Sequence, residues 1–444
     1  PVRCTAYLPD IGDVLPVYVA DRYEGFQAVP FPDLDEEAVE GYVEANVAAV
    51  REVTERAGPE VALANHLVMG PAILARALGG RVPYAVKVHG SALEYTVKPN
   101  PERFMPYARE GLAQATGVLV GSRHTAESLW EAMGDPDLPE RTRLGPPGVD
   151  ADTFRPASDP EEAASGLTAL ADKIEGAAAA GWGGEAGAAQ ALRALDPARE
   201  EIVTYVGKLI VSKGVDLLIA AWPVVYETVP NARLCVVGFG TYREALKELA
   251  SALQRGDLDR ARDIADRGRE LEGGPPGALR YLRDFLDRVD GDYLAAARDA
   301  FERVHFTGRL EHDDVPPLLV NSSAQVVPST FPEAFGMVAA EAAACGALPL
   351  SAAHSGLLEV SRHLQEAVDE DVRPLLSFEL GGDAVDQIAA KLSRWLTMDR
   401  DRRERAATAL SELARADYGW EGVAKGVIAA ADGHLDELAR PTHG

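Results

Sequence analysis

Two glutamates eight positions apart lie in a sequence context that suits the binding of an anion. Glu333 and Glu341 belong to the stretch FPEAFGMVAAEAAACG at 331–346, in which Gly336 precedes an Ala-rich helical pattern. A strand, a glycine-bearing loop and a helix N-terminus direct backbone N–H groups and the helix dipole at one place, so the segment predicts an anion cradle. We expect Glu333 at the mouth of that site and Glu341 one turn inside the helix, within reach of a ribose or sugar hydroxyl. The alternative is that both are solvated residues near a helix start.

Two lysines five residues apart supply the opposite charge. Lys208 and Lys213 flank a short turn in YVGKLIVSKG at 205–214, after a strand that ends at Gly207. Two ammonium groups in one turn suit a diphosphate, whose negative charge grows as its bond to carbon breaks, so they stabilise it most in the transition state. The alternative is a pair of surface lysines near a strand end.

A histidine ends a strand candidate in the first half of the chain. His89 follows the run 83–88 and precedes Gly90. At the carboxyl edge of a parallel sheet, such a side chain can approach a ligand and donate to a developing charge. A lone histidine is more often structural, so that alternative stays open.

Other catalytic motifs are missing from the sequence. It contains no HExxH, no GxSxG and no GxxxxGK[ST], and the GxG at 238–240 lacks the third glycine of a dinucleotide fingerprint. The three cysteines lie far apart without CxxC spacing, which argues against a disulfide framework and a zinc site. These absences disfavour metal, serine-hydrolase and P-loop chemistry.

Composition limits the partners. The 444 residues are 47% hydrophobic and 26% charged, as expected for two or three globular domains. With 70 acidic against 44 basic residues the net charge is −26, which disfavours nucleic acid and anionic lipid as partners. No apolar run reaches the roughly 18–20 residues of a membrane helix, so we expect no integral membrane protein and a cytoplasmic location.

The elements that must position these residues alternate between short apolar runs and longer helical patterns. Such alternation predicts α/β domains with parallel sheets covered by helices. The strand candidates are 60–65, 83–88, 116–121, 202–207, 232–238, 303–307, 324–328 and 346–351. The helix candidates are 35–56, 70–78, 104–113, 124–133, 214–227, 242–254, 314–320, 337–345 and 383–397.

The alternating elements form two series, which predict two doubly wound, Rossmann-like domains. Residues 1–155 form the first domain, and 201–415 form the second, with a helical insertion at 241–302. The Ala/Gly-rich segment 156–200 between them predicts a linker or insert, flexible apart from a short helix. The insertion either covers the cleft, binds a protein partner or is a solvated decoration. We expect 416–444 to be a helix that crosses back to the first domain.

Four blocks in this order, together with YGW at 418–420, resemble the retaining glycosyltransferases of family 4. The blocks are HGS at 89–91, GPPGVDADTFRP at 145–156, VGKLIVSKGVDLLI at 206–219, and FTGRL at 306–310 followed by the block of Glu333 and Glu341. The resemblance implies the GT-B fold, with two Rossmann-like domains facing across a cleft. It also implies transfer of a sugar from a nucleotide-diphosphate sugar with retention of anomeric configuration.

The resemblance assigns a role to each candidate residue. Glu333 would contact the transferred sugar near its reacting face, and Glu341 would contact the nucleotide ribose. Lys208 and Lys213 would neutralise the diphosphate, and His89 would face the donor sugar from the first domain. The remaining donor-binding residues, which would use mainly their backbone, are Gly207, Phe335, Gly336, Met337 and Val338.

Three features depart from the family pattern. The family more often has Arg where this chain has Lys208, and the insertion at 241–302 of this chain is longer than the family usually carries. The first strand with its glycine-rich loop is not recognisable, and residues 1–34 resemble the middle of a first domain. We therefore expect several tens of upstream residues to be lacking, with consequences for acceptor binding and activity.

The hypothesis for the reaction is same-face transfer, in which the leaving phosphate oxygen takes the proton of the acceptor. We expect no metal or other cofactor, because lysine charge replaces it. The acceptor is unassigned, whether small molecule, glycan or lipid-linked compound. One alternative is a non-catalytic nucleotide-sugar-binding or regulatory protein of GT-B fold. Another, a GT-B phosphorylase with a pyridoxal cofactor, finds no supporting lysine context.

Overall fold

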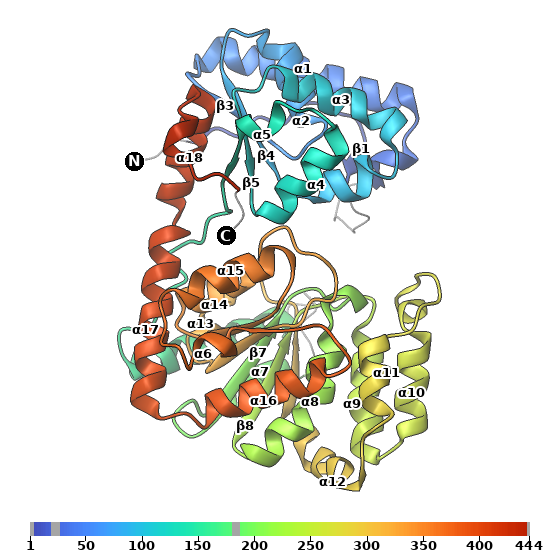
Figure 1. Cartoon of the computed structure of the whole chain (residues 1–444), viewed down its shortest axis with the longest axis vertical. Helices are drawn as coiled ribbons and strands as arrows, with labels where there is room; N and C mark the ends of the chain where they lie inside the picture. The colour runs from blue at the N-terminus through green and yellow to red at the C-terminus, as the bar shows by residue number, and fades with distance from the viewer. Residues whose placement is uncertain (1–3, 19–26, 180–186, 442–444) are drawn as a thin grey trace. The chain divides into compact units, whose positions relative to one another are not determined.

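The chain folds into two compact units in a computed structural model that describes residues 4–18, 27–179 and 187–441 (Figure 1). Unit 1 comprises Pro1–Gly148 and Glu421–Gly444, and unit 2 comprises Val149–Trp420. Each unit contains a parallel sheet with helices packed against it, as alternating strands and helices predict.

Unit 1 is built on a four-stranded parallel sheet in the order β3-β4-β5-β6, with a separate parallel pair β1-β2. β3, β4 and β5 match predicted strands, whereas the other three, of three or four residues each, were not anticipated. The strands are β1 (Val14–Val17), β2 (Gln27–Pro30), β3 (Ala62–Asn65), β4 (Tyr84–Val88), β5 (Gly117–Val120) and β6 (Thr142–Leu144).

The first helix shows how local sequence sets the limits of an element. The Asp35 side chain accepts a hydrogen bond from the Ala38 N–H at 2.8 Å, and Gly58 ends the helix with φ 55°. Valines at 39, 43 and 47 recur every four residues and are buried in the core of unit 1. The helices of unit 1 before the second unit begins are α1 (Glu36–Ala57), α2 (Gly70–Leu78), α3 (Pro101–Ala113), α4 (Arg123–Met133) and α5 (Leu138–Arg141).

The end of the chain belongs to unit 1. α18 (Trp420–Asp432) buries Ala430 and Ala431 against Ala85 and Leu119 of the sheet. Its approach is close, because a Cβ atom on Gly117 would lie 2.7 Å from the carbonyl oxygen of Ala430. α18 therefore completes a face of the unit 1 sheet.

Unit 2 contains a six-stranded, all-parallel sheet in the order β12-β11-β10-β7-β8-β9. From β7 the chain first adds strands on one side and then returns to add β10 to β12 on the other, so the strand order reverses between β7 and β10. Five of these strands were predicted, and the two-residue β12 was not. The strands are β7 (Glu201–Val206), β8 (Ala232–Val237), β9 (Val304–Gly308), β10 (Ala324–Val327), β11 (Leu348–Ala352) and β12 (Ser377–Phe378).

The helical insertion lies between β8 and β9, as predicted, and contributes to the core of unit 2. Leucines and alanines on its helices are buried together with α8, so the insertion is not a solvated decoration. The helices of unit 2 are α6 (Pro160–Ala179), α7 (Ala188–Arg193), α8 (Val215–Thr228), α9 (Arg243–Arg255), α10 (Leu258–Arg267), α11 (Arg280–Leu286), α12 (Gly291–Ala300), α13 (Pro316–Leu319), α14 (Met337–Ala344), α15 (Ser355–Gln365), α16 (Ala384–Leu396) and α17 (Arg400–Asp417).

The expectation of a flexible linker at 156–200 is wrong for the described part of that segment. α6 and α7 pack on unit 2, where Leu167, Leu170 and Leu192 are buried with Ile202 and Leu318. The alanines that suggested a spacer are strong helix formers, and the leucines three residues apart form the buried face. Residues 180–186 of the segment lie outside the described residues.

The boundaries between units also differ from the expected positions at 155 and 415. Val149 donates its backbone N–H to the carbonyl oxygen of Tyr418 at 2.7 Å, and Phe154 is fully buried in the core of unit 2. These contacts tie residues 149–155 to the end of α17. The first unit therefore ends at Gly148, and the chain returns to it at Glu421.

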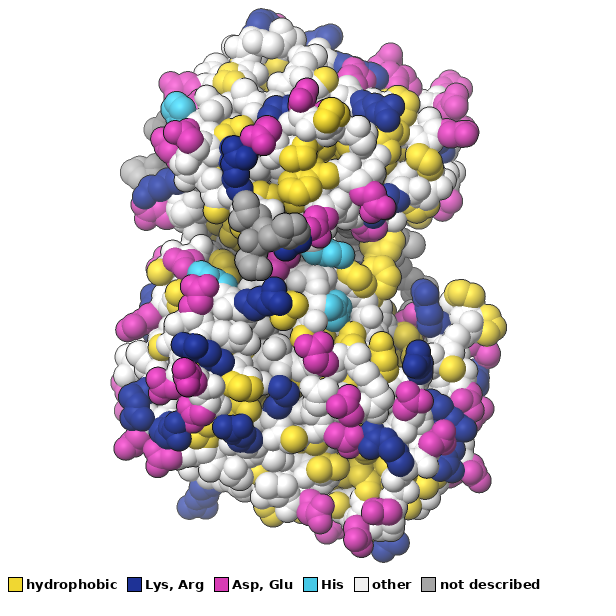
Figure 2. All heavy atoms as spheres, in the orientation of Figure 1, with side chains coloured by type: hydrophobic (Ala, Val, Ile, Leu, Met, Phe, Trp, Pro, Cys, Tyr) yellow, Lys and Arg dark blue, Asp and Glu magenta, His cyan; other side chains and the backbone are white. Residues whose placement is uncertain are grey.

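Charges of both signs are mixed on the one face of the molecule that Figure 2 shows. On the face shown in Figure 2, Lys and Arg side chains are interspersed with Asp and Glu side chains on both units. The net charge of −26 is thus not gathered into one acidic field on this face. Among the described residues, no helix combines the length and apolar composition that a bilayer span requires.

Candidate functional site

The predicted Lys213 and Glu333 side chains meet at the carboxyl edge of the unit 2 sheet. β7 and β10 are neighbours in the sheet but distant in sequence, so the loops after them come together where the strand order reverses. Lys213 ends a 3-10 helix, Val211–Lys213, that follows β7, and Glu333 lies in the loop after β10. The Lys213 ammonium forms an ion pair with Oε1 of Glu333. Two residues predicted from separate motifs therefore belong to one site.

Close backbone contacts hold the turn of Lys213 against the loop of Glu333. Thr330 donates its backbone N–H to the carbonyl oxygen of Ser212 at 2.9 Å. Gly214 has φ 63°, and a Cβ atom there would lie 2.0 Å from the carbonyl oxygen of Pro328. A larger residue at 214 would be strained and would push the two loops apart. The position of Lys213 beside Glu333 depends on this approach.

Lys208 and Gly207 lie at the start of the same turn, directly after β7. The Tyr205 hydroxyl donates to the carbonyl oxygen of Lys208 at 2.8 Å, and the Gly207 N–H donates to that of Val237 at 3.1 Å. Burial raises the pKa of Tyr205 far above its usual range, so this hydroxyl keeps its proton. The backbone that carries Lys208 is therefore held by both its own strand and the neighbouring one.

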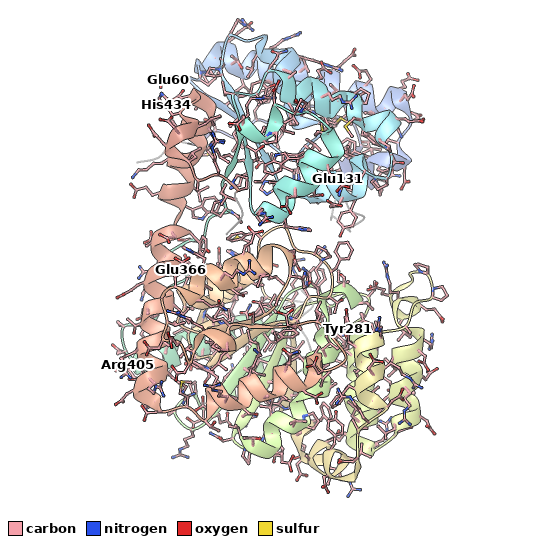
Figure 3. The ribbon with its side chains drawn as sticks, viewed as in Figure 1. Glu60, Glu131, Tyr281, Glu366, Arg405 and His434 are labelled. Carbon is pink, nitrogen blue, oxygen red and sulfur yellow. The ribbon has the colours of Figure 1, made fainter. Side chains whose placement is uncertain are left out.

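The helical insertion reaches the turn of Lys213 as well. Glu272 accepts a hydrogen bond from the backbone N–H of Val211 at 2.8 Å. Buried Asp216, in the first turn of α8, lines a cavity of about 300 Å³ with residues 277–282 of the insertion, among them Tyr281 (Figure 3). Burial raises the pKa of Asp216 to about 7. The insertion is thus part of the surroundings of this turn.

Glu333 is held at both its backbone and its carboxylate. Ser329 Oγ donates to Oε1 of Glu333 at 2.8 Å, and the Glu333 backbone N–H donates to Ser355 Oγ at 2.9 Å. The side chain of Glu333 is 25% exposed, so it remains accessible to a ligand. The carboxylate therefore sits in a fixed position beside the lysine while one side of it faces solvent.

α14, where the sequence predicts an anion cradle, begins at Met337. Gly336 has φ 152°, and no side chain among the described residues caps this N-terminus. The first N–H groups of the helix and the positive end of its dipole are thus left for an external anion. The residues whose amides were predicted to hold the ligand lie in this turn: Phe335, Gly336, Met337 and Val338.

Glu341 lies one turn into α14, as predicted, and is 5% exposed. Its Oε1 is 2.8 Å from Nε2 of His312, whose ring centroid lies 4.9 Å from that of Phe154 with the two rings tilted by 42°. Burial raises the pKa of the Glu341 carboxyl, and the contact with His312 opposes this shift. A ligand hydroxyl at Glu341 would either replace His312 or share the carboxylate with it.

His89 lies in unit 1, at the carboxyl end of β4. Its Nε2 is 2.8 Å from Oδ1 of Asn65, and its ring centroid is 5.0 Å from that of His66. Burial, reinforced by the charges of His66 and Lys87, lowers the pKa of His89 to about 4. The imidazole is therefore neutral at pH 7 and acts as a hydrogen-bonding group rather than as a cation.

Sequence reasoning missed several polar residues of these sites. Asn65 ends the predicted strand at 60–65 and His66 directly follows it, and His354 and Ser355 follow the predicted strand at 346–351. Position at a strand's carboxyl end was the signal that could have found them, and it was applied to Lys213, Glu333 and His89 but not to these residues. His312 lacked any such signal, because its role depends on a contact with a residue 29 positions away.

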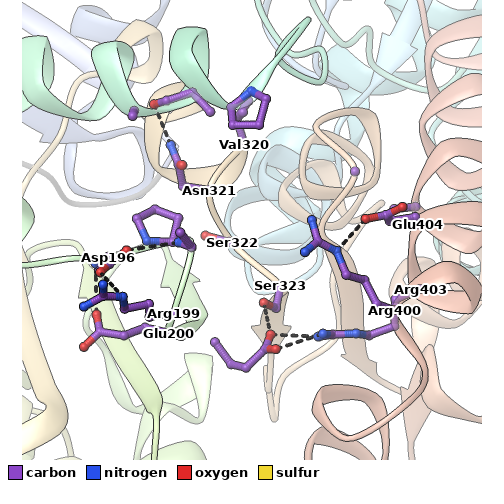
Figure 4. Close-up of a pocket in the computed structure, with 18 of the residues that line it drawn as sticks. Asp196, Arg199, Glu200, Val320, Asn321, Ser322, Ser323, Arg400, Arg403 and Glu404 are labelled. Atoms are coloured by element: carbon purple, nitrogen blue, oxygen red, sulfur yellow. Dashed lines mark hydrogen bonds and ion pairs between the residues drawn. The ribbon is translucent and has the colours of Figure 1, made fainter.

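A further cavity, of about 710 Å³, lies at the opposite edge of the unit 2 sheet. It is lined by Glu201, where β7 begins, and by Ser323, which precedes β10. In Figure 4, Ser323 and Arg403 both contact a carboxylate, which is that of Glu201, at 2.6 and 2.7 Å. This cavity is at the amino ends of the strands and is therefore separate from the site of Lys213 and Glu333.

The fold is that of a GT-B glycosyltransferase, and comparison with known families agrees. Residues 14–148 match the family described as "Glycosyl transferase 4-like domain". Residues 193–257 and 291–410 match "Glycosyl transferases group 1", with a gap that falls in the insertion. The chain belongs to the glycosyltransferases of the family 4 type.

Relatives with curated names are about a quarter identical to this chain over the aligned residues. A "D-inositol 3-phosphate glycosyltransferase" of Salinispora tropica is 27% identical over 345 residues, 77% of this chain and 56% of the relative. A second protein of that name, from Xylanimonas cellulosilytica, is also 27% identical. The alignment covers 77% of this chain and 63% of that relative. The aligned part is thus about three fifths of these two relatives.

Solved structures share the fold. Sucrose-phosphate synthase of Thermosynechococcus elongatus has a TM-score of 0.55 at 19% identity, covering 92% of this chain and 81% of that one. The HepE protein of Anabaena, in complex with UDP-glucose, has a TM-score of 0.56 at 16% identity, covering 96% and 92%. At such identities these likenesses concern the architecture.

Proposed function

We propose that the protein transfers a sugar from a nucleotide-diphosphate sugar to an acceptor hydroxyl with retention of anomeric configuration. The contact between Lys213 and Glu333, directly beside the uncapped N-terminus of α14, is the observation that carries the proposal. It combines a cation and helix amides for a diphosphate with a carboxylate for the sugar. Names of relatives support a sugar donor of this class, since one is a "GDP-mannose-dependent" mannosyltransferase of Mycolicibacterium smegmatis.

In the proposed reaction, the bond from the sugar carbon to the diphosphate oxygen breaks and the bond to the acceptor oxygen forms on the same face. The acceptor proton passes to the departing phosphate oxygen. Lys208, Lys213 and the start of α14 stabilise the charge that develops on the diphosphate. Glu333 stabilises the positive charge on the sugar, and Glu341 accepts a hydrogen bond from the ribose.

We assign no metal or cofactor to this reaction, because the lysines and the helix N-terminus supply the positive charge that the diphosphate needs. His89, which is neutral and directs its Nε2 proton at Oδ1 of Asn65, would accept a hydrogen bond from a sugar hydroxyl at Nδ1. A hydroxylated phosphate compound is one possible acceptor, given the name of the inositol phosphate relatives. The unpaired buried thiols of Cys235 and Cys345 support a reducing, cytoplasmic location.

The test is calorimetry of the chain with UDP, GDP and ADP, followed by assay of sugar transfer from the matching nucleotide sugar. We expect one nucleotide to bind and its sugar conjugate to be turned over. Binding of none of the three would overturn the proposal of a nucleotide-sugar enzyme. Binding without turnover across small-molecule, glycan and lipid-linked acceptors would instead support a non-catalytic nucleotide-sugar-binding protein.

Replacing Glu341 by alanine should weaken nucleotide binding by about 10- to 100-fold, because a hydrogen bond to a charged group is worth roughly 1.5–3 kcal/mol. Inorganic pyrophosphate, which has no ribose, should bind the Glu341→Ala variant and the parent protein equally. Calorimetry with both ligands measures the difference. An equal loss of affinity for pyrophosphate would mean that Glu341 supports the cradle rather than the ribose.

A further inference from the structure

The loop between β11 and α15 contains a backbone conformation that its sequence does not favour. Ser355 has φ 50°, in the left-handed region that glycine occupies easily and other residues avoid. Glycine would relieve this strain, and the next residue in the chain is a glycine. A serine held in such a conformation indicates that its hydroxyl is used.

The Ser355 hydroxyl and the following amide hold the backbone of Glu333. Ser355 Oγ accepts the Glu333 N–H at 2.9 Å, and the Gly356 N–H donates to the Glu333 carbonyl oxygen at 2.9 Å. A Cβ atom at Gly356 would lie 2.6 Å from backbone atoms of Phe335, so the two segments are in direct contact. Both backbone polar groups of Glu333 are therefore bound by the start of α15.

His354 extends these contacts to the carboxylate of Glu333. Its Nε2 is 2.7 Å from the carbonyl oxygen of Ser329, which can only accept, so Nε2 carries the proton. In the neutral ring Nδ1 is then free to accept the Ser355 hydroxyl proton, at 3.0 Å. Ser329 in turn donates its own hydroxyl to Oε1 of Glu333 at 2.8 Å. The four residues form a closed ring of hydrogen bonds.

We propose that His354 and Ser355 are positioning residues that fix the Glu333 carboxylate toward the transferred sugar. Ser355 accepts the backbone N–H of Glu333, and His354 contacts both Ser355 and Ser329. The Ser329 hydroxyl reaches the carboxylate at 2.8 Å, which is shorter than its distances of 3.1 and 3.2 Å to the carbonyl oxygens of Ser212 and Phe331. Lys213 contacts the same Oε1 from the opposite loop, so the ring also fixes the ion pair. The inference rests on the proposed sugar transfer, in which Glu333 acts on the sugar.

The decisive variant is Ser355→Gly, because stability and positioning should change in opposite directions. Glycine adopts φ 50° without strain, so the melting temperature should stay equal or rise. Loss of the hydroxyl frees the Glu333 backbone, and kcat should fall by about tenfold or more, since small misplacements of catalytic groups are costly. The Kd for the nucleoside diphosphate should change by less than about twofold, because its cradle is intact.

Two substitutions of His354 complete the test. His354→Phe, which removes both ring nitrogens, should lower kcat as Ser355→Gly does, and His354→Gln, whose amide can donate to Ser329, should recover part of the loss. His363→Phe is the matched control on the same helix, since His363 contacts Asp417, at 2.8 Å. Its kcat should equal that of the parent protein.

The outcomes separate this inference from the proposed function. If the parent protein binds a nucleotide and transfers its sugar while Ser355→Gly has an unchanged kcat, the positioning role is wrong and the proposed function stands. If the parent protein binds no nucleotide, both fail. Nucleotide affinity that drops together with kcat in Ser355→Gly would also contradict positioning, because the residue would then be part of the cradle.

Discussion

The variant Lys213→Ala should lose about 10²- to 10³-fold in kcat/KM while its thermal stability hardly changes. Removal of one preorganised group that meets developing negative charge typically costs this much. The Lys213 and Glu333 side chains are 31% and 25% exposed, and an ion pair of this accessibility contributes at most about 1 kcal/mol to stability. Steady-state kinetics and thermal melting of the same preparation measure the two effects.

A matched lysine in the same unit provides the control. Lys173, on α6, forms its ion pair with Asp314, at 2.6 Å, rather than with Glu333. Lys173→Ala should therefore leave kcat/KM unchanged. Lys213→Arg should restore part of the activity, since it keeps the charge but changes the geometry. Near-parental turnover of Lys213→Ala would remove this residue from the mechanism.

The fold was largely predictable because its strands carry a local signal. The eight predicted strands all appear, since buried parallel strands are continuous apolar runs such as 202–207 and 324–328. Strands of two to four residues, such as Ser377–Phe378, offer too few positions for such a signal. α6 was missed for another reason, because its alanines suggested a spacer and the leucines at 167 and 170 were not taken as a helix face.

The positions of the candidate site residues along the elements could be predicted, but their contacts could not. Strand ends identified Lys213, Glu333 and His89, whereas the pairing of Lys213 with Glu333 requires β10 to lie beside β7, which only the sheet order reveals. The same holds for Glu341 and His312, whose contact joins α14 to the segment after β9. Sequence patterns locate residues along elements, and tertiary packing decides which loops meet.

The variant Glu333→Gln should lose activity while it binds the nucleoside diphosphate more tightly than the parent protein does. In the structure Glu333 Oε1 holds the Lys213 ammonium, so a bound diphosphate must compete with this carboxylate. Glutamine removes the competing charge, and we expect the Kd for the nucleoside diphosphate to fall by about two- to fivefold, a change of roughly 0.4–1 kcal/mol. The same variant should lose about 10²-fold or more in kcat, because an amide does not stabilise positive charge on the sugar.

Calorimetry and steady-state kinetics of the parent protein, Glu333→Gln and Glu366→Gln decide whether Glu333 competes with the diphosphate for Lys213 or only forms a structural ion pair with it. Glu366→Gln, at the end of α15 (Figure 3), is the control for removal of a carboxylate, since Glu366 is 73% exposed. It should match the parent protein in both measurements. If Glu333→Gln bound nucleotide more weakly, the carboxylate would be organising Lys213 for the diphosphate rather than competing with it. The double variant with Lys213→Ala should then show no further loss of affinity, because both substitutions would disable the same contact.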